Sequence, residues 1–329
     1  MSILEFLPDK VYEIEYTEDT WLEERRKGIG GSDVAVVMGL NKYKSELKLY
    51  KEKVEGLTED LSDNIYIKKG KDLEDLIRVK YCDPYFKNMG YYLLHPNTIL
   101  CNKDYAIFRA NLDAFAIPAD FKGNYENNIV VEIKWVSEYG EANWDGDEYC
   151  GVPANYYAQV QEYMFVTGAR KAIICALFDS DWTPRFYEIP YSADFVANMV
   201  KEATRFMECN VGMRIAPRIN SELDKEFITS ALSKSKDVEL NINEDMDFKI
   251  VNYKEIKQNI KTLEKGANEL LSELTQMYLD GYRPRSPLLS MKITKVSSKK
   301  FDVAEFEKAH PELYKQFVKD SEYSRTTIK

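Results

Sequence analysis

The segments Arg-Ala-Asn-Leu-Asp at 109–113 and Val-Val-Glu-Ile-Lys-Trp at 130–135 decide the predicted fold. The second segment is rich in β-branched and apolar residues, which is typical of a strand, and alternate residues of a strand project to the same face. Glu132 and Lys134 are therefore expected to point the same way. The pattern places an acid and a base side by side in an apolar setting.

A second run, Ala-Ile-Phe-Arg-Ala at 106–110, predicts a strand just before Asp113. The turn-forming residues Gly123 and Asn124 lie between this run and the Glu132 strand. We therefore expect a hairpin with a long loop, which would bring Asp113 beside Glu132.

Two carboxylates on one face repel each other and are costly to desolvate, so they require a cation. Oxygen ligands suit a hard divalent ion such as magnesium or manganese. Lys134 would then position or activate an attacking water, a combination suited to metal-assisted phosphodiester hydrolysis. The alternative is an ordinary solvated pair of Glu132 and Lys134, as is common on exposed strand faces. The apolar setting and the upstream Asp113 favour the metal site.

The composition describes a folded protein of 329 residues, long enough for two domains or for one domain with an appendage. No apolar run approaches the ~18 residues of a membrane span, so we expect a soluble, cytoplasmic protein with no membrane partner. Five scattered cysteines without a C-x-x-C pair favour reduced thiols. Only two histidines are present, which disfavours a zinc site or a histidine-based triad.

The net charge of −10 argues against nucleic acid binding, because phosphate contacts depend on Lys and Arg. The distribution of charge matters more than the total, since an acidic protein can bind DNA in a locally basic channel. The segment 281–300 contains no Asp or Glu. Its basic residues are Arg283, Arg285, Lys292, Lys295, Lys299 and Lys300.

A glycine-rich approach, Gly-Ile-Gly-Gly-Ser-Asp at 28–33, leads into a predicted helix. A helix start of this kind exposes backbone N–H groups and can bind a phosphate. Ser32 would lie at that start, and Arg25 could supply the counter-charge. The alternative is an ordinary glycine turn with a capping serine.

The order of the remaining elements predicts a mixed sheet flanked by helices, an α/β fold. Glu74 lies in one predicted helix, either as a solvated carboxylate or as a further ligand of the metal site, and Gln159 lies in another. A polar segment at 137–151 is expected to form a mobile loop over the site. Helices are predicted at 46–55, 65–81, from 153 and at 192–211, and further strands at 90–94, 98–100, 171–178 and 185–189.

The character of the chain changes at about residue 220, which predicts a core at 1–219 and a C-terminal extension at 220–329. The extension would contain a long amphipathic helix or helical hairpin at 243–280, the basic segment 281–300 and a short terminal helix. The helical part could pack on the core or bind another protein. Its apolar residues, spaced by three and four, are Ile256, Ile260, Leu263, Ala267, Leu270, Leu274 and Met277.

Taken together, the motifs resemble the YqaJ-like viral recombinase family, relatives of phage lambda exonuclease. The resemblance covers about residues 20–205, and the segment 298–325 is similar to the C-terminal signature of prophage members. The motifs are Trp21-x-x-x-Arg25, Gly28-Ile-Gly-Gly-Ser32-Asp33, Gly70-x-x-x-Glu74, Asn111-Leu-Asp113, Glu132-Ile-Lys134 and Ala158-Gln159-Val-Gln161.

The resemblance implies a PD-(D/E)XK restriction-endonuclease-like core and a 5′→3′ exonuclease acting on linear double-stranded DNA, which leaves 3′ overhangs for a single-strand annealing protein. It also implies a homotrimeric ring in the cytoplasm of a bacterial host, encoded by a phage or prophage. Two Mg²⁺ or Mn²⁺ ions would be held by Asp113, Glu132, the Ile133 carbonyl and Glu74.

The remaining roles follow from the same resemblance. Lys134 would be the catalytic lysine and Gln159 the glutamine beside it, while Arg25, Ser32 and Asn111 would bind the 5′ phosphate. Leu112 replaces the proline of the fold's name, and Asn111 replaces a small hydroxyl residue. The basic residues Arg283, Arg285, Lys292 and Lys295 are candidate DNA contacts.

Two alternatives stay open. The first is an endonuclease of the same fold, of the restriction or junction-cleaving type, which would cut closed circles and would not need Arg25 and Ser32. The second is an inactive DNA-binding scaffold for recombination, which the complete set of Asp113, Glu132 and Lys134 disfavours.

Overall fold

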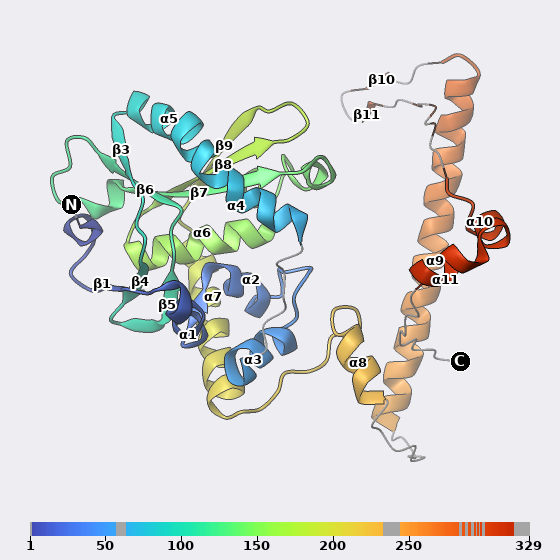
Figure 1. Cartoon of the computed structure of the whole chain (residues 1–329), viewed down its shortest axis with the longest axis horizontal. Helices are drawn as coiled ribbons and strands as arrows, with labels where there is room; N and C mark the ends of the chain where they lie inside the picture. The colour runs from blue at the N-terminus through green and yellow to red at the C-terminus, as the bar shows by residue number, and fades with distance from the viewer. Residues whose placement is uncertain are drawn as a thin grey trace. The chain divides into compact units, whose positions relative to one another are not determined.

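The computed structural model describes residues 2–56, 64–232, 244–282, 285–286, 289–290, 293, 295, 297 and 300–318. The chain forms two compact units, residues 1–224 and 225–329 (Figure 1). The sequence placed this boundary at 219/220. Two of the predicted DNA contacts, Arg283 and Lys292, lie outside the described residues.

The first unit is built on a five-stranded sheet with the order β3-β6-β7-β8-β9. Strands β7 and β8 are parallel, and the other neighbours are antiparallel. The α/β class with a mixed sheet is therefore confirmed. The strands are β3 Tyr91–Leu94, β6 Ala114–Pro118, β7 Ile129–Val136, β8 Lys171–Phe178 and β9 Pro184–Pro190.

Helices cover both faces of this sheet (Figure 1). On one face, α4 (Ile65–Ile77) and α5 (Asp83–Asn88) pack their apolar residues against Ala114, Val131 and Ile173. On the other face lies α6 (Ala154–Thr167), the crossover helix between β7 and β8. A single turn of π-helix, Arg78–Cys82, joins α4 to α5.

A second, four-stranded sheet has the order β1-β4-β5-β2. Its strands are β1 Val11–Ile14, β4 Ile99–Asn102, β5 Tyr105–Ala110 and β2 Ile29–Gly30, with β2 parallel to β5. Helices α1 (Glu18–Arg26) and α2 (Gly31–Val37) contact β2, and α6 contacts β4 and β5. Helices α3 (Glu46–Glu55) and α7 (Ala193–Arg205) pack on α2. No helix among the described residues is long and apolar enough to cross a membrane.

The predicted hairpin was wrong in one respect. The strand at 106–110 belongs to the second sheet, and the antiparallel neighbour of β7 is β6. Strand β6 was missed because it is buried over almost its whole length, so it lacks the alternation of apolar and polar residues that marks a half-buried strand. Asp113 lies at the point where the chain passes from one sheet to the other.

The predicted mobile loop at 137–151 contains two short 3₁₀ turns, Glu138–Asn143 and Tyr149–Gly151. Between them Trp144 is buried against the ring of Phe178. Arg185 of β9 holds Asp145 at 2.7 Å. The segment is therefore tied to the sheet by an aromatic and an ionic contact.

The second unit contains one continuous helix, α9 (Glu244–Leu279), where the sequence left a helix or a hairpin open. Its other elements are α8 (Lys225–Leu232), the short strands β10 (Arg285–Ser286) and β11 (Leu289–Ser290), α10 (Val303–Ala309) and α11 (Pro311–Phe317). The sequence predicted a short terminal helix and missed α11.

Candidate active site

Glu132 and Lys134 lie on the face of β7 that meets α6, because their neighbours Val131 and Ile133 pack on the α4 side. Glu132 is fully buried. Its Oε1 accepts hydrogen bonds from the Lys134 ammonium and, at 2.7 Å, from Nε2 of Gln159. Its Oε2 has no hydrogen-bond partner in the described structure. A buried carboxylate oxygen without a donor is costly, so this atom is suited to a cation.

Asp113 meets the same strand from the edge. The ladder between β6 and β7 ends at the pair of Ala114 and Val131, and beyond it the Ile133 N–H donates to Oδ2 of Asp113 at 2.8 Å. The N–H and C=O of one strand residue point to the same side. The Ile133 carbonyl therefore faces the edge that Asp113 occupies.

The carboxylates of this cluster disfavour one another's charge. Burial and the neighbouring Asp113 raise the pKa of Glu132 to about 8. Burial likewise raises the pKa of Asp113, although Lys134 opposes the shift. The pKa of Glu74, on α4, is raised by burial and by Asp113. The three predicted acidic residues therefore lie within electrostatic reach of one another.

These groups do not form a finished metal shell. Within the described part of the chain, no three His, Cys, Asp or Glu side chains are grouped so that they could hold a metal ion. In this arrangement the Lys134 ammonium contacts Oε1 of Glu132, and the Ile133 N–H contacts Oδ2 of Asp113. The donor chemistry nevertheless suits a hard cation.

His95 is a site residue that the sequence interpretation missed. It follows β3 in the expected turn, and its Nδ1 lies 2.6 Å from the main-chain oxygen of Asp113. A carbonyl oxygen only accepts, so Nδ1 carries the hydrogen. His95 thus anchors the backbone of Asp113. No signal in the sequence connects these two residues, which lie 18 positions apart in different turns.

Helix α6 connects this cluster to the glycine-rich segment. Gln159 also donates to the hydroxyl of Tyr163 at 3.0 Å, which confirms that the two share a helix face. A Cβ on Gly31 would lie 2.7 Å from both Cγ of Gln159 and Cε1 of Tyr163. Only glycine allows the start of α2 to pack this closely on Gln159.

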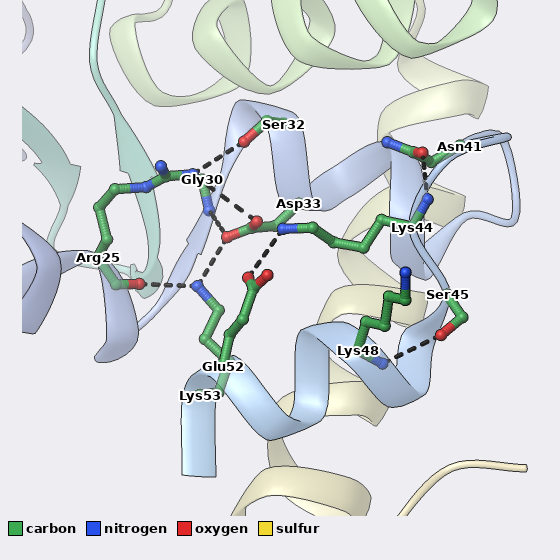
Figure 2. A network of polar contacts seen from close by, with 10 residues as sticks. All are labelled: Arg25, Gly30, Ser32, Asp33, Asn41, Lys44, Ser45, Lys48, Glu52 and Lys53. Carbon is green, nitrogen blue, oxygen red and sulfur yellow. Dashed lines mark hydrogen bonds and ion pairs between the residues drawn. The ribbon is translucent and has the colours of Figure 1, made fainter. Parts of the chain in front are cut away.

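Arg25 and Ser32 form the pair that the sequence brought together. Nη2 of Arg25 donates to Oγ of Ser32 at 2.9 Å and lies 3.8 Å from Oδ1 of Asp33 (Figure 2). The Arg25 guanidinium also stacks on the ring of Trp21. Ser32 is exposed, and the Arg25 side chain is about one-third exposed. Both groups are therefore accessible to an anion.

A buried ion pair, formed by Lys53 and Asp33, supports Arg25 and Ser32. Nζ of Lys53 lies 2.7 Å from Oδ2 of Asp33 and donates to the Arg25 carbonyl at 2.7 Å (Figure 2). Burial alone would raise the pKa of Asp33, but Lys53 and Arg25 outweigh it and lower that pKa. Gly30 is the N-cap of α2, with Asp33 accepting from its N–H, so Ser32 is not the capping residue.

The other predicted residues lie elsewhere. Asn111 accepts a long hydrogen bond of 3.5 Å from the Tyr16 hydroxyl, and among the described contacts it has none with Arg25 or Ser32. Arg285 begins β10, and Lys295 is exposed. Both belong to the second unit.

Residues 20–170 match the family model of the YqaJ-like viral recombinase domain. Over these residues the chain is similar to that family. The matched segment contains every predicted residue of the carboxylate cluster and of the Arg25 pair. The match confirms the family resemblance that the motifs indicated.

Similar proteins extend beyond this domain. The uncharacterized protein YqaJ of Bacillus subtilis (strain 168) is 26% identical over 329 residues, covering 96% of this chain and 95% of that protein. Among solved structures, the alkaline exonuclease LHK-Exo from Laribacter hongkongensis is 19% identical, with a TM-score of 0.46 over 66% of this chain and 98% of its own. A phage related exonuclease from Haemophilus somnus 129PT is 13% identical, with a TM-score of 0.42 over 57% of this chain and 96% of its own.

The ion pair beneath Arg25 generates a prediction about stability. Lys53→Met should lower the free energy of unfolding at pH 7 by about 3–5 kcal/mol, because Asp33 stays buried without its main partner. The lowered pKa of Asp33 stabilises the wild type above the unfolded pKa of about 4, and this contribution is lost as the pH falls. Protonation of Asp33 also relieves the variant, so the deficit should shrink towards acid pH.

Denaturant titrations at several pH values measure this deficit. Lys48→Met, on the same helix, is the matched control and should change stability little, since the side chain of Lys48 lies outside the Asp33 ion pair. A deficit of equal size at pH 7 and in mild acid would contradict the assigned role of Asp33.

Proposed function

We propose that this protein is a metal-dependent exonuclease that degrades one strand of linear double-stranded DNA from the 5′ end and leaves 3′ overhangs for phage-type recombination. The observation that carries the proposal is the state of Glu132. This carboxylate is buried, has one oxygen without a donor, and has its pKa raised to about 8 by burial and Asp113. Such a group is stable as an anion only beside a cation.

Asp113, Glu132 and the Ile133 carbonyl, with support from Glu74, would hold Mg²⁺ or Mn²⁺, two ions per site. The ions would supply positive charge at the scissile phosphate and lower the pKa of a bound water. The donors are all oxygen atoms, which these cations prefer. Asp113 and the Ile133 carbonyl lie at the same edge of strand β7, and this arrangement supports them as ligands of the ions.

Lys134 acts as a charged donor in this proposal. Burial alone would lower its pKa, but the carboxylates of Glu132 and Asp113 outweigh burial and raise it. The ammonium therefore keeps its proton at neutral pH and can orient a water or a phosphate oxygen by hydrogen bonding. Gln159 of helix α6 donates to the same oxygen of Glu132 and so fixes the position of that carboxylate.

Arg25 and Ser32 would bind the 5′ phosphate. Their accessible guanidinium and hydroxyl can donate to phosphate oxygens, and arginine suits phosphate because its donors form a planar fork. Asn111 was predicted to join them, and its described hydrogen bond is with the Tyr16 hydroxyl. Arg285 and Lys295 of the basic segment are proposed as further DNA contacts.

The direction of digestion, a homotrimeric ring, an annealing partner and a bacterial cytoplasmic setting follow from the family resemblance and are part of the proposal. A ring would keep the enzyme on its DNA product during stepwise digestion. The endonuclease alternative requires cleavage of DNA that has no free end. The accessible pair of Arg25 and Ser32 favours the end-dependent activity.

The proposal predicts digestion of linear duplex but not of closed circular duplex, with Mg²⁺ and not with EDTA. Lys134→Ala should reduce the rate by at least a hundredfold, because it removes a charged donor from the reacting phosphate. Release of acid-soluble nucleotides measures the rate, and strand-specific end labels report the direction. Cleavage of the circle at the linear rate would exclude the exonuclease, and wild-type turnover of Lys134→Ala would exclude this site.

The phosphate pocket predicts a selective effect at the DNA end. Arg25→Ala should slow digestion of 5′-phosphorylated ends by about 10–100-fold, as expected for losing a charge-assisted hydrogen bond worth about 1.5–3 kcal/mol. Digestion of 5′-hydroxyl ends should change much less. Arg26→Ala, one position along α1, is the matched control. Equal slowing on both ends would remove Arg25 from phosphate recognition.

The hydrogen bond from His95 to the backbone of Asp113 predicts that loss of His95 changes the metal dependence of the rate. His95→Ala should raise the Mg²⁺ concentration needed for half-maximal rate by about 10–100-fold, the usual effect of losing a group that orients a metal ligand. His95→Asn should recover part of the loss, since the Asn amide can donate to the same carbonyl. His310→Ala, in the second unit, should have no effect. An unchanged Mg²⁺ profile for His95→Ala would show that this contact is only structural.

A further inference from the structure

Helix α9 carries an exposed apolar stripe with a strict repeat. Its members alternate at spacings of three and four residues along the helix. Several are largely exposed, with 58% of Ile256, 73% of Leu263 and 63% of Leu270 accessible to solvent. The stripe consists of Tyr253, Ile256, Ile260, Leu263, Ala267, Leu270, Leu274 and Met277.

The period of this stripe identifies the kind of occupant. An α-helix has 3.6 residues per turn, so a strict seven-residue repeat drifts around the helix by about 20° per heptad. The stripe stays on one line only when two helices supercoil around each other with the same repeat. The occupant is therefore a helix with a matching heptad, and a second copy of α9 provides one.

The flanking charges indicate an antiparallel arrangement. Lys257 follows the stripe residue Ile256, and Glu264 follows Leu263, so the two occupy equivalent flanking positions one heptad apart. In an antiparallel pair these positions face each other across the stripe. The register that places Ile260 beside Leu263 of the second copy then places Lys257 beside Glu264 of that copy, twice by symmetry.

The same register explains an apolar residue outside the stripe. Leu271 is 56% exposed and occupies the flanking position one heptad after Glu264. The antiparallel alignment brings it opposite Ile250 of the second copy. A parallel pair would instead place Lys257 and Glu264 opposite asparagines, Asn252 and Asn259, and would leave both charges without a partner.

We propose that α9 of one chain pairs with α9 of a second copy in an antiparallel two-stranded coiled coil. Across the two-fold axis, the core layers pair Ile260 with Leu263, Ile256 with Ala267, and Tyr253 with Leu270. Each layer combines one residue from either side of the axis, which gives a closed, self-complementary interface. This association needs neither DNA nor metal, so it can be tested independently of the proposed nuclease activity.

The charge pairs allow a test with the full-length chain. Sedimentation velocity, without DNA or metal and at a concentration near the wild-type midpoint, should give the Lys257→Glu and Glu264→Lys variants at most about three-quarters of the weight-average mass of the wild type, close to that of the unpaired state. Each single reversal creates two like-charge contacts and should weaken pairing by about tenfold or more. A one-to-one mixture of the two variants should recover the wild-type mass, because every contact then joins opposite charges.

Controls separate this interface from other occupants. Lys261→Glu, which lies on α9 outside the stripe and its flanks, should behave as the wild type, and Leu263→Asp should abolish the pairing. Packing of the stripe within one chain, or against a different protein, would not respond to mixing two variants. Failure of the mixture to regain mass, or wild-type mass for Leu263→Asp, would overturn the proposal.

Discussion

The placement of the fully buried Glu132 beside the partly buried Asp113 is the constraint on which the rest of the first unit depends. Both carboxylates have raised pKa values because burial removes them from water and Asp113 acts on Glu132. An apolar sheet does not tolerate such a pair without compensation. The compensation comes from Lys134, Gln159 and the Ile133 N–H, and it leaves one oxygen of Glu132 without a donor.

The groups that surround the two carboxylates come from several elements of the first unit, so the site requires them to be packed together. Strand β7 supplies Lys134, α6 supplies Gln159, and the turn after β3 holds the Asp113 backbone through His95. Gly31 allows α2 to pack on Gln159, which joins the carboxylate cluster to the segment of Arg25 and Ser32. Under the proposed function, this joining would hold a DNA end at a fixed distance from the carboxylate cluster.

Much of this arrangement could be predicted from local patterns. The period of a strand was enough to place Glu132 and Lys134 on one face, and the period of a helix was enough to place Gln159 with Tyr163. Helix α3 was predicted with its observed bounds because its Ser45 cap and terminal Gly56 mark both ends. Charge and spacing suggested Arg25 as the counter-charge for an anion beside Ser32, and the two side chains are in contact.

What could not be predicted depends on contacts between distant segments. The predicted path of the chain around Asp113 was wrong because a strand that is buried over almost its whole length, as β6 is, has no periodic signal. The contact of His95 was missed because it joins two turns that are far apart in the sequence. The ion pair of Asp33 and Lys53 was also missed, since neither segment contains a pattern that predicts contact with the other. Local periodicity fixes which face a residue occupies, whereas tertiary packing decides what it faces.

The positions of the charged residues in the structure change how the net charge of −10 bears on nucleic acid binding. Some of the acidic residues are buried, as Glu132 is, and under the proposed function a bound divalent ion would offset their charge towards a phosphate. The cations that could meet DNA are concentrated at defined points, such as Arg25 and Lys134. Local placement therefore decides whether a polyanion can approach, and the total charge governs only long-range repulsion, which salt screens beyond about 8–10 Å.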